Sequence, residues 1–167
     1  MYCLVTIYFL GLSGVLSPVS LGSRVQSGLN LVVAIDHQSV GQQYHQLAKL
    51  LNINQPITTI PIVDHFNKVN NLDSAIDFNL NNHLGPIIDN SKLNPNLRLA
   101  FSGIPHATNR SPLVTPVGYA KAQAAVHADD PTSPSAGVIN LVSAVQLKNN
   151  NRVIWSGSVD LFTDNYT

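Results

Sequence analysis

The sequence predicts an α/β domain, because a buried strand is followed at once by an amphipathic helix and a β-hairpin comes near the end. Residues 29–36 (LNLVVAID) are a continuous apolar run ending in a carboxylate, typical of a strand inside a parallel sheet. Residues 39–53 place apolar side chains at helical spacing, namely Tyr44, Leu47, Ala48 and Leu51. Residues 138–148 and 152–158 flank an asparagine cluster, and asparagine tolerates the left-handed backbone that tight hairpin turns need.

The segments between these elements are less regular. Ser39 is placed to cap the start of the predicted helix. Residues 56–67 (PITTIPIVDHFN) are β-branched and interrupted by prolines, which suits an edge or crossing strand. Residues 67–96 are rich in Asn, Asp and Pro and are predicted to be mostly loop with short elements. Residues 97–103 (LRLAFSG) are predicted to form the next strand, and residues 129–135 an exposed turn.

The length and composition suit a single domain and argue against a nucleic-acid partner. The chain has 167 residues, of which 44% are apolar, so it can bury a core. Only 11% are charged, against about 25% in an ordinary domain, and asparagine supplies much of the polarity. This low charge reflects either the general composition of proteins from the source organism or a surface that lies against partner proteins. The net charge is +0 with scattered basic residues, so no nucleic-acid partner is expected.

Residues 1–27 are interpreted as an apolar leader. Residues 2–16 are too short for a membrane span and resemble the hydrophobic region of a signal peptide, with Ser20 and Gly22 spaced like a cleavage site. No Lys or Arg precedes them, and the alternative is a buried strand followed by a Ser-Pro turn. Cys3 is the only cysteine, so neither a disulfide within the chain nor a Cys/His zinc pattern is expected.

The serines near the strand ends do not form a nucleophile elbow. That motif needs G-x-S-x-G between a strand and a helix, and neither WSGSV nor AFSGI matches it. The predicted strands at residues 97–103 and 152–158 share the sequence aromatic-Ser-Gly near their ends. A glycine there can turn the chain off the sheet at positive φ. Gly157 is therefore predicted to make a turn, and Ser158 to cap a following helix with Asp160 near its start.

Histidines and carboxylates at strand ends give the one enzymatic alternative. Asp36, Asp64 and His65 follow predicted extended runs, and ligands gather at that edge in α/β folds. Such residues more often bond to turn amides. The histidines show no metal-ligand spacing; they are His37, His45, His65, His83, His106 and His127. No phosphate-binding motif occurs, so no catalytic, cofactor or metal site is assigned, with a small hydrolase-like enzyme as the alternative.

A longer segment resembles a known family. Residues 141–164 (LVSAVQLKNNNRVIWSGSVDLFTD) closely resemble a signature segment of the 48 kDa subunit of oligosaccharyltransferase, the DDOST family. The segments GLNLVVAID, YHQLAKLLNI, IVDHFN and LAFSGIPHATNRSPLVTPV resemble that family in the same order. The resemblance covers roughly residues 28–167.

The resemblance implies a partial amidotransferase-like α/β domain (of the flavodoxin or Rossmann type) on the lumenal side of the endoplasmic reticulum membrane. The only cysteine, Cys3, lies in the leader, so the amidotransferase nucleophile is lacking. The family implies a non-catalytic structural role beside other oligosaccharyltransferase subunits, with no cofactor. Its members are longer and end in a membrane helix, so a truncated chain is expected here. Residues 121–128 (KAQAAVHA) are expected to be extended by the same resemblance.

Two acceptor motifs for N-glycosylation occur, at Asn109 and Asn165. They matter only if the chain enters the secretory pathway, and Pro112 after the first motif would hinder its use.

Overall fold

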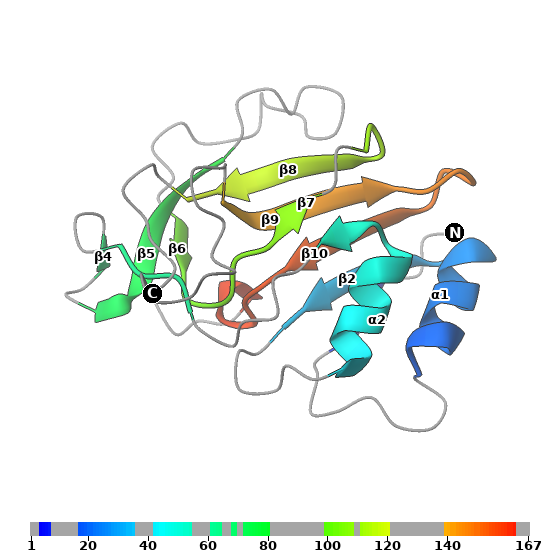
Figure 1. Ribbon diagram of the computed structural model, residues 1–167, viewed down its shortest axis with the longest axis horizontal. Coiled ribbons are helices and arrows are strands. Elements are labelled where there is room, and N and C mark those ends of the chain that lie inside the picture. The colour runs from blue at the N-terminus through cyan, green and yellow to red at the C-terminus, as the bar shows by residue number, and fades with distance from the viewer. Residues whose placement is uncertain are drawn as a thin grey trace.

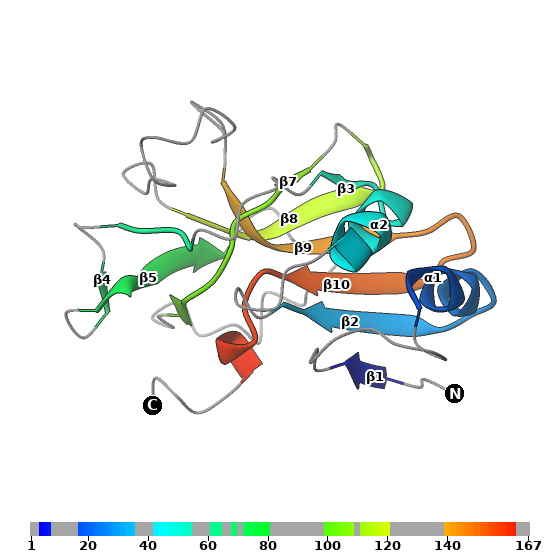
Figure 2. The ribbon, with the colours of Figure 1, turned by 60° about the horizontal axis from the view of Figure 1, so that its bottom comes forward.

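The computed structural model describes residues 4–7, 17–35, 42–54, 61–64, 68–69, 72–80, 99–108, 111–120 and 139–162. In these residues the chain forms a mixed α/β fold (Figure 1). Eight strands make one sheet in the order β1-β2-β10-β9-β8-β5-β4, with β6 paired to β5, and β3 pairs with β7 in a separate ribbon. Helices α1 and α2 lie side by side over β2 and β10 (Figures 1 and 2).

The part of the sheet under the helices is parallel. Strand β2 (Asn30–Ala34) pairs with β1 (Leu4–Ile7) on one side and with β10 (Arg152–Ser156) on the other, in parallel both times. Helix α1 (Pro18–Gln26) connects β1 to β2, and α2 (Gln42–Leu50) follows β2. The predicted strand and helix at residues 29–36 and 39–53 are therefore confirmed.

The rest of the sheet is antiparallel. Strand β9 forms the predicted hairpin with β10, and pairs on its other side with β8. The strands and the final helical turn are β9 (Asn140–Gln146), β8 (Val114–Tyr119), β5 (Leu72–Leu80), β4 (Lys68–Val69), β6 (Leu99–Phe101), β3 (Ile53–Asn54), β7 (Ala107–Thr108) and η4 (Asp160–Phe162). The β8–β9 register shifts between Pro116 and Tyr119, so this pairing is irregular.

Helix α1 begins where the sequence changes from apolar to small and polar residues. Ser17 accepts a hydrogen bond from the backbone N–H of Ser20, and Pro18 occupies the first turn, where its missing N–H costs nothing. Leu21 and Val25 face the sheet and are fully buried. The Ser-Pro pair is therefore a helix start, whereas the alternative interpretation expected only a turn after the strand.

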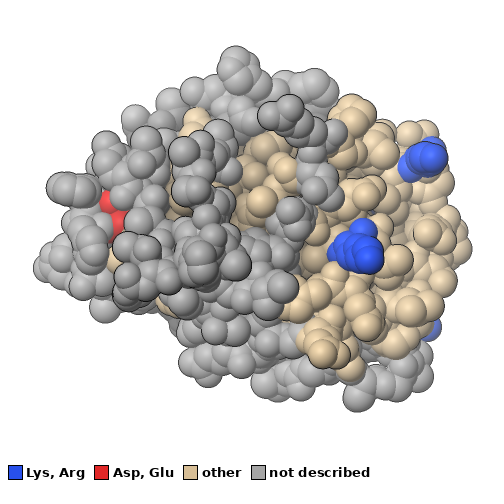
Figure 3. Space-filling model, in the orientation of Figure 1, with Lys and Arg blue, Asp and Glu red and all other residues tan. Residues whose placement is uncertain are grey.

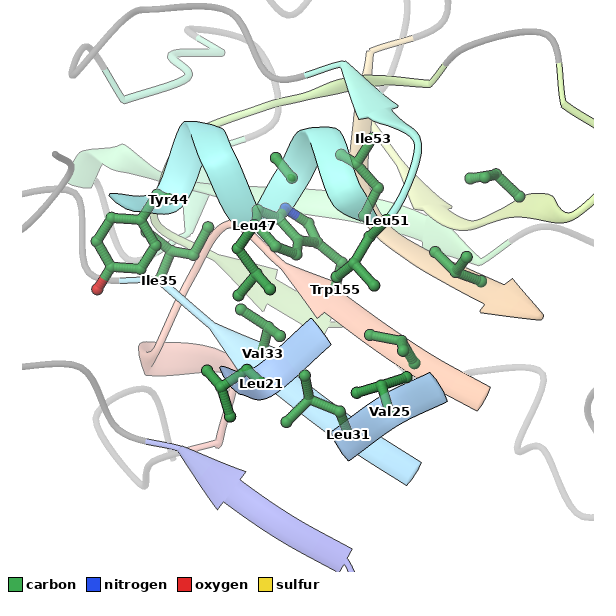
Figure 4. Close-up of a cluster of buried hydrophobic side chains, with 14 residues drawn as sticks. Leu21, Val25, Leu31, Val33, Ile35, Tyr44, Leu47, Leu51, Ile53 and Trp155 are labelled. Carbon is green, nitrogen blue, oxygen red and sulfur yellow. The ribbon is translucent and has the colours of Figure 1, made fainter. Parts of the chain in front are cut away.

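Two clusters of apolar side chains fill the fold. The helix-side core lies between α1, α2 and the sheet, and is built around Trp155 (Figure 4). Its members are Leu21, Val25, Leu31, Val33, Ile35, Tyr44, Leu47, Ala48, Leu51, Ile53, Val114, Val145, Val153 and Trp155. The second core includes Ile62, Ile76, Phe78, Phe101, Leu141 and Val142, with Ile154 packed against it. Val153 and Trp155 thus face one core and Ile154 the other, as strand alternation predicts.

The prediction that residues 67–96 are mostly loop was wrong for their first part. Residues 72–80 form β5, a strand of nine residues, in which Ile76 and Phe78 belong to the second core. Apolar residues recur there at every second position, at Ile76, Phe78 and Leu80, which is the period of a half-buried strand. The many Asn and Asp residues concealed this period.

The boundary at residue 27 stays a prediction, but the first 27 residues contribute to the fold. They supply β1, which pairs with β2 through four residues, and α1, whose buried face belongs to the helix-side core. The expected extended segment at residues 121–128, the turn at 129–135 and the cap Ser39 lie outside the described residues.

Candidate functional site: the crossing of the two Ser-Gly strand ends

The two strand ends that share a Ser-Gly sequence lie against each other. After β6 the chain runs through Ser102 and Gly103, and after β10 it runs through Gly157 and Ser158. The backbone N–H of Ile104 donates to the carbonyl of Gly157 at 2.8 Å, and the N–H of Gly157 donates to the carbonyl of Leu141 at 3.2 Å. The two turns therefore cross with direct backbone contact.

This contact explains why both positions are glycine. A Cβ on Gly157 would overlap the carbonyl oxygen of Ile104, and a Cβ on Gly103 would overlap the carbonyl oxygen of Gly157. Neither glycine has a positive φ; among the described glycines only Gly28 does. The prediction of a turn at Gly157 holds, but the expected reason, a left-handed backbone, was wrong. The close approach of another segment excludes a side chain instead.

The serines of the crossing are bonded to the backbone around them. The Ser156 hydroxyl donates to the carbonyl of Ser158 at 2.9 Å and accepts from the N–H of Ser158 at 3.2 Å. The Ser158 hydroxyl donates to the carbonyl of Ser102. Both side chains are buried. Ser158 therefore joins the two strand ends and does not cap η4, so the predicted cap was wrong. In this arrangement the hydroxyls stabilise the crossing and face no open surface.

Asp64 is the one residue of the hydrolase-like alternative that the structure describes. It is 1% exposed, on a segment held to the crossing by the hydrogen bond from the N–H of Ile62 to the carbonyl of Gly103 at 2.9 Å. Asp36 and His65 lie outside the described residues, so the three are not seen together. The prediction of this alternative stays untested.

The structure also contains a buried polar pair that the sequence analysis did not single out. His106 follows the crossing, and its Nε2 lies 2.7 Å from the hydroxyl of Ser143 on β9. The backbones of His106 and Asn140 exchange hydrogen bonds at 2.9 and 3.2 Å. His106 is 1% exposed, and burial lowers the pKa of its imidazole to about 3, so it is neutral at pH 7.

Two polar atoms beside this pair have no hydrogen-bond partner, Nδ1 of His106 and Oδ1 of Asn140. The side-chain amide of Asn140 donates instead to the hydroxyl of Thr108 at 3.4 Å. A Ser–His pair can activate a nucleophile, but both of these side chains are fully buried. The signal in the sequence was Ser143 itself, because a serine inside the apolar run NLVSAV needs a buried partner.

The remaining candidates are dispersed or lie elsewhere. His45 is half-buried on α2. Outside the described residues lie Cys3, His37, His83, Asn109, His127 and Asn165. Within the described part of the chain no three His, Cys, Asp or Glu residues are grouped so that they could hold a metal ion.

The asparagine cluster has a structural role at the opposite end of the hairpin. The side-chain amides of Asn149 and Asn151 donate to the carbonyl of Val25, and Asn149 also donates to that of Gln26. These are the last carbonyls of α1, which have no partner inside the helix. Asn150 has a φ of 64°, as expected for a tight turn. The cluster thus fastens the β9–β10 turn to the C-terminus of α1.

The fold is that of a mixed α/β domain. At the crossing, the hydroxyls of Ser156 and Ser158 donate to backbone carbonyls of the same domain. The family model described as OST48, N-terminal domain, matches residues 4–167. The chain therefore belongs to this family, and the match also covers most of the segment interpreted as a leader. A comparison with curated proteins found no match.

Membership of the OST48 family implies a subunit of oligosaccharyltransferase, a complex with other subunits, and location in the endoplasmic reticulum. No helix within the described ranges is long and apolar enough to cross a membrane.

Proposed function

We propose that this chain is a non-catalytic structural subunit of the oligosaccharyltransferase complex on the lumenal side of the endoplasmic reticulum membrane. There it would support the transfer of a lipid-linked oligosaccharide to Asn in N-X-S/T sequences. The family match over residues 4–167 carries this proposal. The bonding of Ser156 and Ser158 to backbone carbonyls supports it, since the most enzyme-like stretch is used to hold two strand ends together.

The finer fold assignment, an amidotransferase-like layered domain, belongs to the same proposal. It is supported by parallel pairing of β1, β2 and β10 and by a helix connecting β1 to β2. These are the features of an open α/β sheet. The location of the only cysteine at position 3, before β1, supports the loss of an amidotransferase nucleophile.

The lumenal location requires passage across the membrane. A signal peptide at residues 1–27 would provide it, and cleavage near Gly22 would then remove β1 and part of α1. Mass spectrometry of the N-terminus of the protein from its native source separates the two uses of this segment. Loss of about 22 residues supports the signal peptide, and an intact N-terminus on a folded chain supports the structural use.

Affinity purification of the tagged full chain from detergent-solubilised microsomes tests the assembly. We expect other oligosaccharyltransferase subunits to copurify, and we expect depletion of the chain to lower the occupancy of N-X-S/T sites. Asp64→Ala and His65→Ala should alter folding or assembly of the chain rather than a turnover of its own, because no turnover is assigned to these side chains.

The hydrolase-like alternative gives the opposite result. The purified chain would then hydrolyse simple esters or phosphate esters, and His65→Ala would abolish the activity with the fold intact. A chain that copurifies with no oligosaccharyltransferase subunit and shows such activity contradicts the proposal.

A further inference from the structure

His106, Asn140 and Ser143 form a buried polar cluster between β9 and the segment that follows the crossing. The three side chains are 1%, 3% and 0% exposed, so bulk solvent does not reach them. A buried donor or acceptor without a hydrogen bond costs free energy, and nearly all such groups in native proteins are bonded to the protein or to an ordered water. The polar atoms of this cluster can therefore be assigned partners one by one.

Two atoms of the cluster have no hydrogen-bond partner among the residues that the structure describes. They are Nδ1 of His106 and Oδ1 of Asn140, and both are buried. The other polar atoms of these side chains are bonded: Nε2 of His106 lies 2.7 Å from the Ser143 hydroxyl, and Nδ2 of Asn140 donates to the Thr108 hydroxyl at 3.4 Å. Each of the two side chains thus has one bonded atom and one atom that needs a partner.

Charged side chains do not supply these partners. Figure 3 shows Lys and Arg side chains on the part of the surface that covers α1, α2 and the β9–β10 turn. Neither these nor any other described charged side chain bonds to the two atoms. The partner is therefore the other atom of the pair or a neutral molecule held inside the domain. The exposed basic side chains are Arg24, Lys49, Lys148 and Arg152.

The Ser143 hydroxyl determines which nitrogen of His106 carries the ring proton. Burial lowers the pKa of His106 to about 3, so at pH 7 the ring has one donor and one acceptor nitrogen. Ser143 has no other side-chain hydrogen bond within the described ranges, so its hydroxyl proton can be satisfied only by donation to Nε2. Nδ1 of His106 is then a donor, and it complements Oδ1 of Asn140, which is an acceptor.

The strand pairing sets the separation of these two side chains. His106 and Asn140 stand opposite each other in an antiparallel bridge, and their backbones exchange hydrogen bonds at 2.9 and 3.2 Å. Side chains at such a pair project from the same face, with Cβ atoms about 5 Å apart. Two hydrogen bonds of about 2.8 Å that meet at one oxygen span nearly the same distance. The separation therefore suits one small molecule that both accepts and donates.

We propose that one internal water molecule is bound between His106 and Asn140, where it accepts from Nδ1–H and donates to Oδ1. A buried polar site with two such partners is an ordinary binding site for water. The water completes a chain of hydrogen bonds from the Ser143 hydroxyl on β9 to the Thr108 hydroxyl on β7. It thereby joins the end of the crossing to both strands, and it is independent of the proposed function.

The first experiment determines the tautomer of His106 in the wild-type chain at pH 7. Long-range proton–nitrogen correlation spectra of the imidazole rings distinguish the protonated nitrogen, and the signals of His106 are identified by their loss in His106→Gln. We expect the proton on Nδ1. A proton on Nε2 overturns the proposal, because Nδ1 then has nothing to donate to the water.

The second experiment detects the water. In wild type the ring protons of His106 should show nuclear Overhauser effects to a signal at the water frequency. Asn140→Leu removes Oδ1 and should abolish this effect, whereas the control Thr108→Val removes only the bond at the other end of the amide and should keep it. Trp155 fluorescence verifies that both variants fold. An effect that persists in Asn140→Leu arises from exchange of the Ser143 hydroxyl proton with solvent, and it overturns the proposal.

A crystal structure of the wild-type chain provides a test that does not depend on the folding of a variant. We expect density for one water within hydrogen-bond distance of both Nδ1 of His106 and Oδ1 of Asn140. A direct hydrogen bond between these two atoms, or the absence of density between them, contradicts the proposal.

Discussion

The parallel half of the sheet under the helices and the antiparallel half are held together in different ways. The parallel half (β1, β2 and β10 with α1 and α2) buries aliphatic side chains around Trp155, and its polar residues cap helix ends. The antiparallel half (β4, β5, β6 and β8) contains register shifts and an edge-to-face aromatic pair of Phe78 and Phe101, with ring centroids 6.0 Å apart. Strand β9 belongs to both halves.

This difference shows where the fold depends on local pattern and where it depends on distant contacts. The parallel half is built from segments whose apolar residues repeat with a helical or strand period. The antiparallel half is joined to it through the β8–β9 pairing and through backbone contact at Gly103 and Gly157, which are far apart in the sequence. We therefore expect the largest effects from changes that remove part of the parallel half or separate the two halves.

Removal of residues 1–22 should have the largest effect. It deletes β1, opens the edge of β2 and takes Leu21 from the helix-side core. A single buried Leu→Ala change costs about 2–5 kcal/mol, whereas a whole domain is stable by about 5–15 kcal/mol. We expect the shortened chain to show no cooperative unfolding transition in urea when unfolding is monitored by Trp155 fluorescence.

The matched control removes only Met1–Cys3 and should unfold like the full chain. If the chain of residues 23–167 unfolds cooperatively at the wild-type urea concentration, residues 1–22 are dispensable for folding. The parallel half would then begin at β2, and the signal-peptide interpretation would gain support.

Gly157→Val should have the next largest effect, because it separates the two strand ends. Its Cβ would overlap the carbonyl of Ile104, and backbone cannot move away as a flexible side chain can. We expect a loss on the order of 3 kcal/mol or more, the range of severe overpacking. Trp155 lies two residues before it and should show a red-shifted emission maximum.

Gly22→Ala is the matched control for this substitution. Its Cβ would meet only the end of the Leu50 side chain, at 3.3 Å, and alanine favours a helix by up to about 1 kcal/mol over glycine. Its stability should remain near that of wild type. Equal stability of Gly157→Val and Gly22→Ala would show that the crossing is not closely packed.

The same contrast explains how much of the structure the sequence could predict. The elements β2, α2 and the β9–β10 hairpin were predicted because their periods are local. Strand β5 was missed because its two aspartates and one asparagine, in an Asn-rich and Asp-rich region, resemble a loop. The burial of Trp155 follows from simple alternation along β10, whereas the overlap that explains Gly157 depends on Ile104, more than fifty residues earlier, and no local pattern encodes it.

The candidate site shows the same limit. The Ser-Gly ends were recognised as a shared feature, but their crossing was not. The partner of Ser158 was expected within the following helix and is the carbonyl of Ser102. The pair of His106 and Ser143 joins residues from β9 and the segment after β6, so only the sheet order brings it together.

Acid should weaken the protein through His106. Its folded pKa, about 3, lies below the unfolded value of about 6.5, so the unfolded chain takes up the proton first as the pH falls. The stability from the neutral imidazole is complete above about pH 6.5 and is lost between about pH 6.5 and 3. The loss from this one group should approach about 1.4 kcal/mol per pH unit within that window.

Urea unfolding of wild type and His106→Gln at several pH values measures this slope. Glutamine retains a polar group that can reach Ser143 and does not titrate, so the variant should be less stable at pH 7 and less dependent on pH below 6.5. Gln46→Asn, at an exposed position of α2, is the control and should keep the wild-type slope. If the free energy of unfolding depends on pH equally in wild type and His106→Gln, His106 is not the source of the acid sensitivity.

The smallest effects should come from the asparagine turn that fastens the hairpin to α1. Asn151→Ala removes one donor to the last carbonyls of α1 and should cost about 1 kcal/mol, the net value of one hydrogen bond. Asn149→Ala removes two such hydrogen bonds and should cost up to about 2 kcal/mol. Because both side chains bond to the carbonyl of Val25, each can compensate for the loss of the other, and the double variant should cost more than the sum of the two single variants.

Asn150→Gly separates this capping from the conformation of the turn. Asn150 has a φ of 64°, which glycine adopts without strain, and its only described side-chain contact is an exposed one with Gln146. Its stability should therefore stay within about 0.5 kcal/mol of wild type. Amide exchange gives the local measurement: the N–H of Leu29, bonded to the carbonyl of Arg24 at the end of α1, should exchange faster in Asn149→Ala and Asn151→Ala but not in Asn150→Gly. If all three variants leave this exchange unchanged, the parallel half holds the end of α1 by apolar packing alone, and the asparagines serve only the turn.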